Sequence, residues 1–160
     1  MGDTGRIPFI SLSDIGWWGR HIFDHPGTTT GKNLEIASHL ITWPELVETI
    51  TRVTGIPAEY KRVTMDEYFK LYDGVDTPVA VDVAIGKGPT FEENFRACFS
   101  LWRDNIVKRD MDWVRRVHPG TVTLEQWLRD ENYNGQMSNI LKSNEDEKRA
   151  IRRSHLAANI

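Results

Sequence analysis

Cysteine is nearly absent from this chain of 160 residues, because Cys98 is the only one. A single cysteine excludes an intramolecular disulfide framework and a zinc site of the Cys-x-x-Cys type. Long apolar runs are missing too, and none approaches the ~18 residues of a membrane-spanning helix. Charge of one sign is not in excess, since 20 basic and 23 acidic residues are interspersed and give a net charge of -3. Such a balance offers no footprint for a polyanion, so we expect neither a membrane nor nucleic acid as a partner.

A secretory signal is not visible, because MGDTGRIPF leads into no apolar segment. Together with the single cysteine, this predicts a cytoplasmic location. A glycine-rich phosphate loop is also missing. Gly86-Lys87-Gly88 lacks the third glycine of a dinucleotide-binding turn, and Thr30-Gly31-Lys32-Asn33 lacks the flanking residues of a P-loop. No Gly-x-Ser-x-Gly elbow occurs. We therefore expect no cofactor and no metal.

Aromatic residues are what the chain has in surplus: six Trp, six Phe and four Tyr. Large flat side chains fill cores, which is their commoner use, and they also line pockets for apolar ligands. Both uses stay open from the sequence.

Helix-start signals recur along the chain. A threonine followed three residues later by Glu or Gln predicts helices after Thr42, Thr64, Thr90 and Thr123. The helix after Thr90 is expected to reach about Val107. Helical spacing also predicts a helix over residues 14–24 with Ser13 as its N-cap, and a short helical segment over 112–117.

Strand signals are shorter. Apolar, β-branched or alternating segments predict strands over residues 7–12, 33–38 and 56–63, while 78–85 fits a strand and a buried helix turn equally. The expected fold class is α/β (α+β), a helix-rich single domain over residues 1–142 with a few short strands. Residues 143–160 carry a run of charge and predict a solvated helical tail.

Two residues are candidates for acid or base catalysis. His21 is one, because a histidine side chain can exchange a proton near neutral pH and His21 follows two tryptophans that could exclude solvent. Asp82 is the lone charge in an apolar run, so burial would raise its pKa, whereas on a half-exposed strand it would simply face solvent. His21 and His25 have the spacing of two metal ligands, but Pro26 disfavours a continuous helical face, and a structural role is favoured.

Candidate ligand-binding residues are the aromatics near these groups and one arginine: Trp17, Trp18, Phe95, Trp102 and Arg103. A guanidinium on an aromatic wall could hold a carboxylate or phenolate of a ligand. Surface pairing with Asp104, Asp110 or Asp112 is the alternative for the arginines of this region. Cys98 lies on an apolar stripe, where a thiol is usually a small hydrophobe.

The order of several motifs is similar to that of a known family. Gly31-Lys32-Asn33-Leu34-Glu35-Ile36-Ala37-Ser38, then Leu40-Ile41-Thr42-Trp43-Pro44-Glu45-Leu46 and, much later, His118-Pro119-Gly120-Thr121-Val122-Thr123-Leu124-Glu125-Gln126-Trp127 resemble the second half of the NmrA-like family. That family consists of atypical members of the short-chain dehydrogenase/reductase superfamily. The resemblance covers about residues 7–135 and implies a substrate-binding lobe.

The family's N-terminal Rossmann half has no counterpart in these residues, so its nucleotide contacts transfer to no position here. The first functional hypothesis is an enzyme that needs no redox cofactor: an isomerase, cyclase or lyase acting on an apolar small molecule, as in fungal secondary metabolism. Its support is the surplus of aromatic residues together with the ligand-facing surface that the resemblance implies. The alternative is a non-catalytic binding or regulatory module that forms a homodimer, with the charged tail packing across a two-fold axis.

Overall fold

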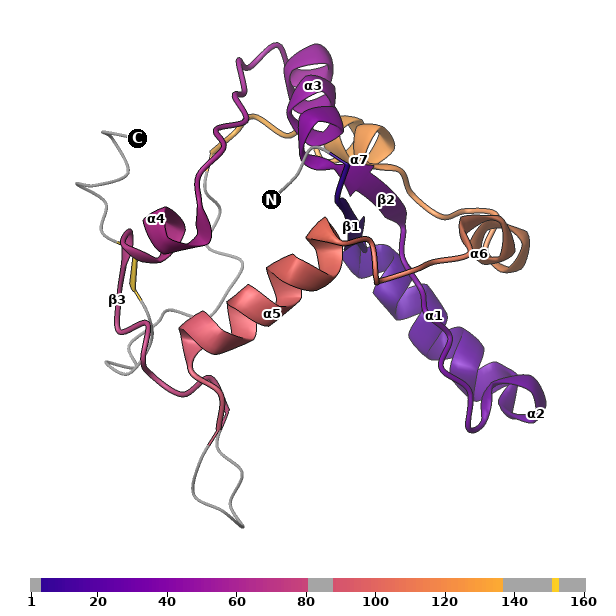
Figure 1. The fold of residues 1–160 in the computed structure, drawn as a ribbon. Helices are drawn as coiled ribbons and strands as arrows, with labels where there is room; N and C mark the ends of the chain where they lie inside the picture. The colour runs from indigo at the N-terminus through magenta and orange to yellow at the C-terminus, as the bar shows by residue number, and fades with distance from the viewer. Residues whose placement is uncertain (1–3, 81–87, 137–150, 153–160) are drawn as a thin grey trace. The chain divides into compact units, whose positions relative to one another are not determined.

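The structure is a computed structural model that describes residues 4–80, 88–136 and 151–152 (Figure 1). Seven helices and four short strands are found in these described residues. The mixed, helix-rich class predicted from the sequence is confirmed. The described residues divide into two compact units. The first unit comprises residues 4–60 and 105–136, and the second comprises 61–80, 88–104 and 151–152.

The first unit is built on a two-stranded antiparallel sheet. Strand β1 (Arg6–Phe9) pairs with β2 (His39–Thr42), and Ile7 lies opposite Ile41. Both isoleucines are buried, so one face of this sheet belongs to the core. The helices of this unit are α1 (Leu12–Asp24), α2 (Pro26–Thr29), α3 (Trp43–Thr54), α6 (Met111–Val117) and α7 (Leu124–Asp130).

Helix α1 begins two residues earlier than the sequence predicted. Its N-cap is Ser11 rather than Ser13, because the Ser11 hydroxyl accepts the backbone N–H of Asp14 at 3.0 Å. The helix ends at Asp24, where His25 precedes a proline, as expected. Asp14 and Trp18 are its buried residues, so they define the face that packs inward.

The threonine caps are confirmed. Thr42, Thr64 and Thr90 each open a helix through a reciprocal capping box with Glu45, Glu67 and Glu93. Thr123 opens α7 by accepting the backbone N–H of Gln126. Gly55 ends α3 in the left-handed region, with φ of 72°, a conformation that glycine adopts without steric cost.

Helices α3 and α7 pack together in the first unit. Arg52 of α3 donates to Glu125 of α7 at 2.9 Å, and Arg129 donates to the same carboxylate. These hydrogen bonds lower the pKa of Glu125 to about 2. The pair is exposed, so it fixes the orientation of the two helices more than it stabilises the fold.

The second unit holds α4 (Met65–Phe69), β3 (Tyr72–Asp73), α5 (Phe91–Arg103) and β4 (Ile151–Arg152), with β3 antiparallel to β4. An aromatic stripe runs along α5. Phe91, Phe95, Phe99 and Trp102 follow one another with ring centroids 4.4, 5.7 and 5.6 Å apart. Phe69 and Leu71 are the buried apolar side chains of this unit's described residues.

Two strand predictions are wrong. Residues 33–38 are irregular and β2 begins only at His39, because Glu35 has a φ of 34° that interrupts an extended chain. Residues 56–63 form no strand either. The N–H groups of Ile56 and Ala58 donate to the hydroxyls of Thr54 and Thr51 instead of to a neighbouring strand, and Pro57 has none to donate.

Other boundaries also differ. Helix α5 stops at Arg103 instead of about Val107, since Asn105 is left-handed with φ of 52°. Near residues 78–85, Pro78 forms an isolated bridge with Thr90, and residues 81–87 lie outside the described residues. The predicted helical tail is described only at Ile151–Arg152, where it forms strand β4, so the helix prediction is wrong at these two positions. The domain boundary predicted at residue 142 lies outside the described residues.

Replacing the cap of α3 tests the role of its capping box. Thr42→Ala leaves the backbone N–H of Glu45 without its acceptor and should lower the free energy of unfolding by about 1 kcal/mol, measured by urea denaturation. The control is Thr49→Ala in the same helix, which removes a threonine outside the cap and should leave stability unchanged or slightly higher. Equal losses in the two variants would contradict the assignment.

Candidate functional site

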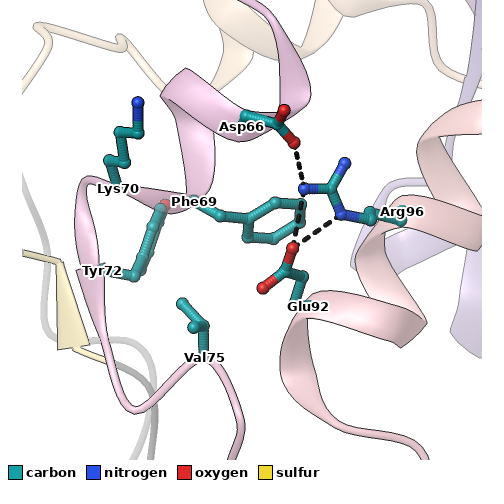
Figure 2. A pocket seen from close by; sticks show the side chains of 7 residues that line it. All are labelled: Asp66, Phe69, Lys70, Tyr72, Val75, Glu92 and Arg96. Atoms are coloured by element: carbon teal, nitrogen blue, oxygen red, sulfur yellow. Dashed lines mark hydrogen bonds and ion pairs between the residues drawn. The ribbon is translucent and has the colours of Figure 1, made fainter.

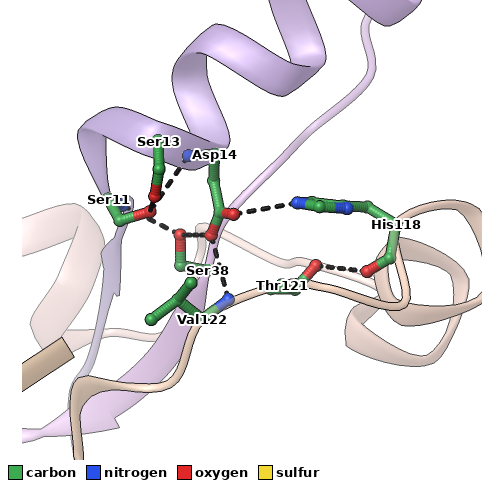
Figure 3. Close-up of polar contacts among 7 residues, drawn as sticks. All are labelled: Ser11, Ser13, Asp14, Ser38, His118, Thr121 and Val122. Atoms are coloured by element: carbon green, nitrogen blue, oxygen red, sulfur yellow. Dashed lines mark hydrogen bonds and ion pairs between the residues drawn. The ribbon is translucent and has the colours of Figure 1, made fainter. Parts of the chain in front are cut away.

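The buried carboxylate of Asp14 is the centre of a polar network in the first unit (Figure 3). Its side chain is 2% exposed. One oxygen accepts from Nε2 of His118 at 2.9 Å, and the other accepts from the hydroxyl of Ser38 and from the backbone N–H of Val122 at 3.2 Å. The network ties α1 to the residue before β2 and to the segment between α6 and α7.

Hydrogen-bond donors keep the carboxylate of Asp14 ionised. Burial alone would raise the pKa of Asp14, but hydrogen bonds from Ser38, Val122 and His118 together hold it below its ordinary value. An ionised Asp14 only accepts hydrogen bonds, so Nε2 of His118 carries a proton. In neutral His118 the lone pair then lies on Nδ1, on the side of the ring that faces Gly120.

The order of groups in this network excludes a nucleophilic triad. In a triad the histidine lies between the serine and the carboxylate. Here Asp14 lies between Ser38 and His118, so the serine hydroxyl donates to the carboxylate and His118 does not contact it. What the network can supply is a histidine of fixed tautomer and orientation, suited to moving a proton at Nδ1.

Four aromatic rings stack one on the next, in the order His118, Trp17, His21 and His25. The Trp17 indole lies against His118, with centroids 3.9 Å apart and planes 8° from parallel. His21 also stacks on Trp17, with centroids 5.0 Å apart, and His25 stacks on His21 with centroids 4.3 Å apart. The imidazoles of His21 and His25 therefore lie face to face. Among the described residues, no group of three or more His, Cys, Asp or Glu side chains could hold a metal ion.

Trp18 is part of the core. It is 1% exposed and packs its ring against Trp113, with centroids 5.4 Å apart. Its Nε1 is buried with no hydrogen-bond partner in the described part of the chain. The core-filling alternative therefore describes Trp18, while Trp17 and His21 stay partly accessible.

The residues that the sequence predicted as one site belong to two units. Trp17, Trp18 and His21 lie on α1 of the first unit, whereas Phe95, Trp102 and Arg103 lie on α5 of the second. Within α5, Phe95 and Trp102 belong to the aromatic stripe. Asp82 lies outside the described residues.

Arg103 follows the surface-pairing alternative. Its Nε and one terminal nitrogen donate to the two carboxylate oxygens of Asp104, at 2.7 and 2.8 Å. The side chain is about half exposed.

A pocket of about 390 Å³ lies in the second unit (Figure 2). Its apolar lining consists of Phe69, Tyr72 and Val75, and its charged lining consists of Asp66, Lys70, Glu92 and Arg96. Arg96 donates to Glu92 at 2.7 Å and to Asp66, and its guanidinium carbon lies 5.0 Å from the centroid of the Phe69 ring. Two carboxylates therefore hold this arginine in place, and together they more than offset its charge.

Sequence reasoning missed the residues that the structure brings together. Asp14 falls on the same helical face as Trp18 and His21, at a spacing of four and then three residues, and an acid on that face was the available signal. No pattern in the sequence links Asp14 to His118, which is 104 residues away. The acidic residues of the pocket, Asp66 and Glu92, directly precede the capping glutamates Glu67 and Glu93 in sequence, and no sequence pattern marked them as a site.

In comparisons with known proteins, no family model and no curated protein matches this chain. The resemblance to the NmrA-like family therefore stays a prediction. No helix among the described residues combines the length and apolar character needed to cross a membrane.

Changing the buried carboxylate should weaken the fold and its response to acid. The folded pKa of Asp14 is lower than the unfolded value of about 3.9, so the ionised group stabilises the fold above that value, and this contribution is lost as the pH falls through the folded pKa. Asp14→Asn points an amide N–H at groups that donate, so we expect the free energy of unfolding at pH 7 to fall by about 3 kcal/mol. Its further fall from pH 7 to pH 3 should be smaller than that of the parent protein in urea titrations.

The matched control is Asp112→Asn, an exposed aspartate of the same unit. It should keep the acid sensitivity of the parent. If the parent and Asp14→Asn lose stability equally between pH 7 and pH 3, the ionised network is not what holds the first unit.

Proposed function

We propose that the protein is a small-molecule-binding module whose ligand is apolar, carries a flat ring and occupies the pocket of the second unit. The observation that carries this is the pocket's size and lining. About 390 Å³ is within the range of sites that hold small organic ligands, and two aromatic rings with Val75 offer the apolar contact such ligands need. This is the non-catalytic alternative expected from the sequence.

The charges of the pocket favour an acidic group on the ligand. Asp66 and Glu92 already hold Arg96, while Lys70 forms no ion pair among the described residues. Lys70 lies across the pocket from Arg96, with Phe69 between them (Figure 2). A carboxylate or phenolate next to the Tyr72 ring could reach its ammonium group, and a charge-assisted hydrogen bond would fix the ligand's orientation.

The resemblance to the substrate-binding lobe of the NmrA-like family supports the same proposal. We also propose a cytoplasmic location, which the single cysteine supports. The homodimer expected from the sequence belongs to this proposal as well.

A simple probe for this pocket is 2-naphthoate, which combines a flat apolar ring with a carboxylate. Its size gives an expected Kd of about 1 mM at ~0.3 kcal/mol per heavy atom. Lys70→Gln should weaken binding about 3–10-fold, because it removes the charge from the hydrogen bond. Binding is measured by chemical-shift titration of the backbone amides of residues 66–75 and 92–96.

The control is Lys61→Gln, an exposed lysine of the same unit that does not line the pocket, and it should leave the Kd unchanged. Naphthalene-2-methanol, which lacks the carboxylate, should bind equally to the parent and to Lys70→Gln. No shift at the pocket amides up to 10 mM naphthoate would reject the proposed site.

A second candidate is the cofactor-independent isomerase, cyclase or lyase expected from the sequence. The specific observation that favours it is the Asp14–His118 pair, in which the carboxylate holds one ring nitrogen and leaves Nδ1 as a base. His118 thus joins His21, the base expected from the sequence, as a group that could move a proton on carbon.

Deuterium exchange tests proton transfer without knowledge of the product. If His118 is the base, the parent protein in D₂O should exchange acidic C–H positions in a panel of phenolic and polyene ketones, and His118→Gln should not. Loss of exchange in His21→Gln alone would assign the role to His21. A panel that shows no exchange above buffer would leave the binding function only.

A further inference from the structure

Helix α1 carries an apolar face that nothing in the first unit covers. Asp14 and Trp18 face the core, while four apolar side chains of the same helix are exposed. Leu12 and Phe23 are 75% and 85% exposed, and Ile15 and Ile22 are nearly half exposed. At 100° per residue these four positions, with Gly16 and Gly19, occupy a stripe about 120° wide. We call these six residues the α1 stripe.

The middle of the α1 stripe is flat. A Cβ atom built on Gly16 or Gly19 would meet nothing within 4 Å. Glycine lowers the stability of a helix interior. Two glycines at the centre of an otherwise apolar face therefore destabilise α1, and the close approach of another helix would offset this loss of stability.

The spacing of the α1 stripe is the same in both directions along the helix. Leu12, Gly16, Gly19 and Phe23 are separated by four, three and four residues. We propose that the α1 stripe pairs antiparallel with the α1 stripe of a second copy of this chain. In this register Gly16 lies opposite Gly19 of the other copy, and Leu12 lies opposite its Phe23. Such a match with itself is what a two-fold interface requires.

The charges on α1 are complementary in the same register. The exposed charged side chains of Leu12–Asp24 are Arg20 and Asp24, which pair with each other at 3.1 Å. Antiparallel packing places Asp24 beside the first turn of the other helix, which is the positive end of the helix dipole and attracts negative charge. A parallel pair would instead bring Asp24 against Asp24. Ile22 approaches Ile15 of the other copy on the opposite flank.

The interface is small, since a helix of 13 residues is about 20 Å long. We therefore expect a reversible dimer with a Kd of about 10–100 µM. It uses α1 rather than the charged tail, and it is independent of the ligand proposed for the second unit.

Alanine at both glycines tests the interface without unfolding the protein. Gly16→Ala with Gly19→Ala meets no neighbour within the chain and improves helix propensity, so the urea midpoint should rise. The added methyl groups keep the two helices apart, so the dimer Kd should rise at least tenfold in sedimentation equilibrium. The control Ile106→Ala trims an apolar side chain that is 60% exposed and not on α1, and it should leave the Kd unchanged.

Cross-linking tests the register. With Cys98→Ser as background, Leu12→Cys and Phe23→Cys proteins should form a disulfide dimer when mixed and oxidised, because antiparallel packing brings these positions together. Neither protein alone should cross-link efficiently, and Ile106→Cys should cross-link with neither.

A parent protein that stays monomeric at 500 µM would overturn the proposal. So would a dimer whose Kd is insensitive to the two alanines, or one in which Leu12→Cys cross-links with itself.

Discussion

The ionised carboxylate of Asp14 is the constraint on which the first unit depends. A buried charge is tolerated only when hydrogen bonds replace the water it has lost. Here the donors come from Ser38, His118 and Val122, so three segments far apart in sequence must meet at one point. The same contact fixes the rotation of α1, because Asp14 and Trp18 have to face inward. Because of this rotation, the α1 stripe faces away from the core and is exposed.

The two units offer different chemistry. The first has a histidine held by a buried acid and stacked against Trp17, together with a helix face suited to a second copy. The second has a pocket in which two carboxylates hold one arginine, while Lys70 forms no ion pair within the described part of the chain. The proposed ligand binding and the proposed self-association therefore depend on separate residues, and variants of one should leave the other intact.

Helix starts could be predicted because a capping box lies within four residues of chain. Thr42, Thr64 and Thr90 each carry their partner glutamate at the fixed spacing, so no distant contact is needed. The strand predictions over 33–38 and 56–63 failed for the opposite reason, since a strand exists only where another lies beside it. Within the predicted strand over 7–12, residues 7–9 do have such a partner and belong to β1. The alternation of apolar and polar residues over 33–38 forms no strand, because the positive φ of Glu35 interrupts the extended chain. After Gly55, the N–H groups of Ile56 and Ala58 donate to threonine hydroxyls instead of to a neighbouring strand.

For the candidate site, the sequence by itself determined which residues share a helix: Trp17, Trp18 and His21 lie on α1, and Phe95 and Trp102 lie at helical spacing on α5. Periodicity encodes that information locally. Only the tertiary structure decided that Asp14 meets His118 across 104 residues, that Trp18 fills the core, and that Asp66 and Glu92 converge on Arg96. These contacts join different elements, and their energy comes from satisfying buried or neighbouring charges, which no local pattern of residues encodes.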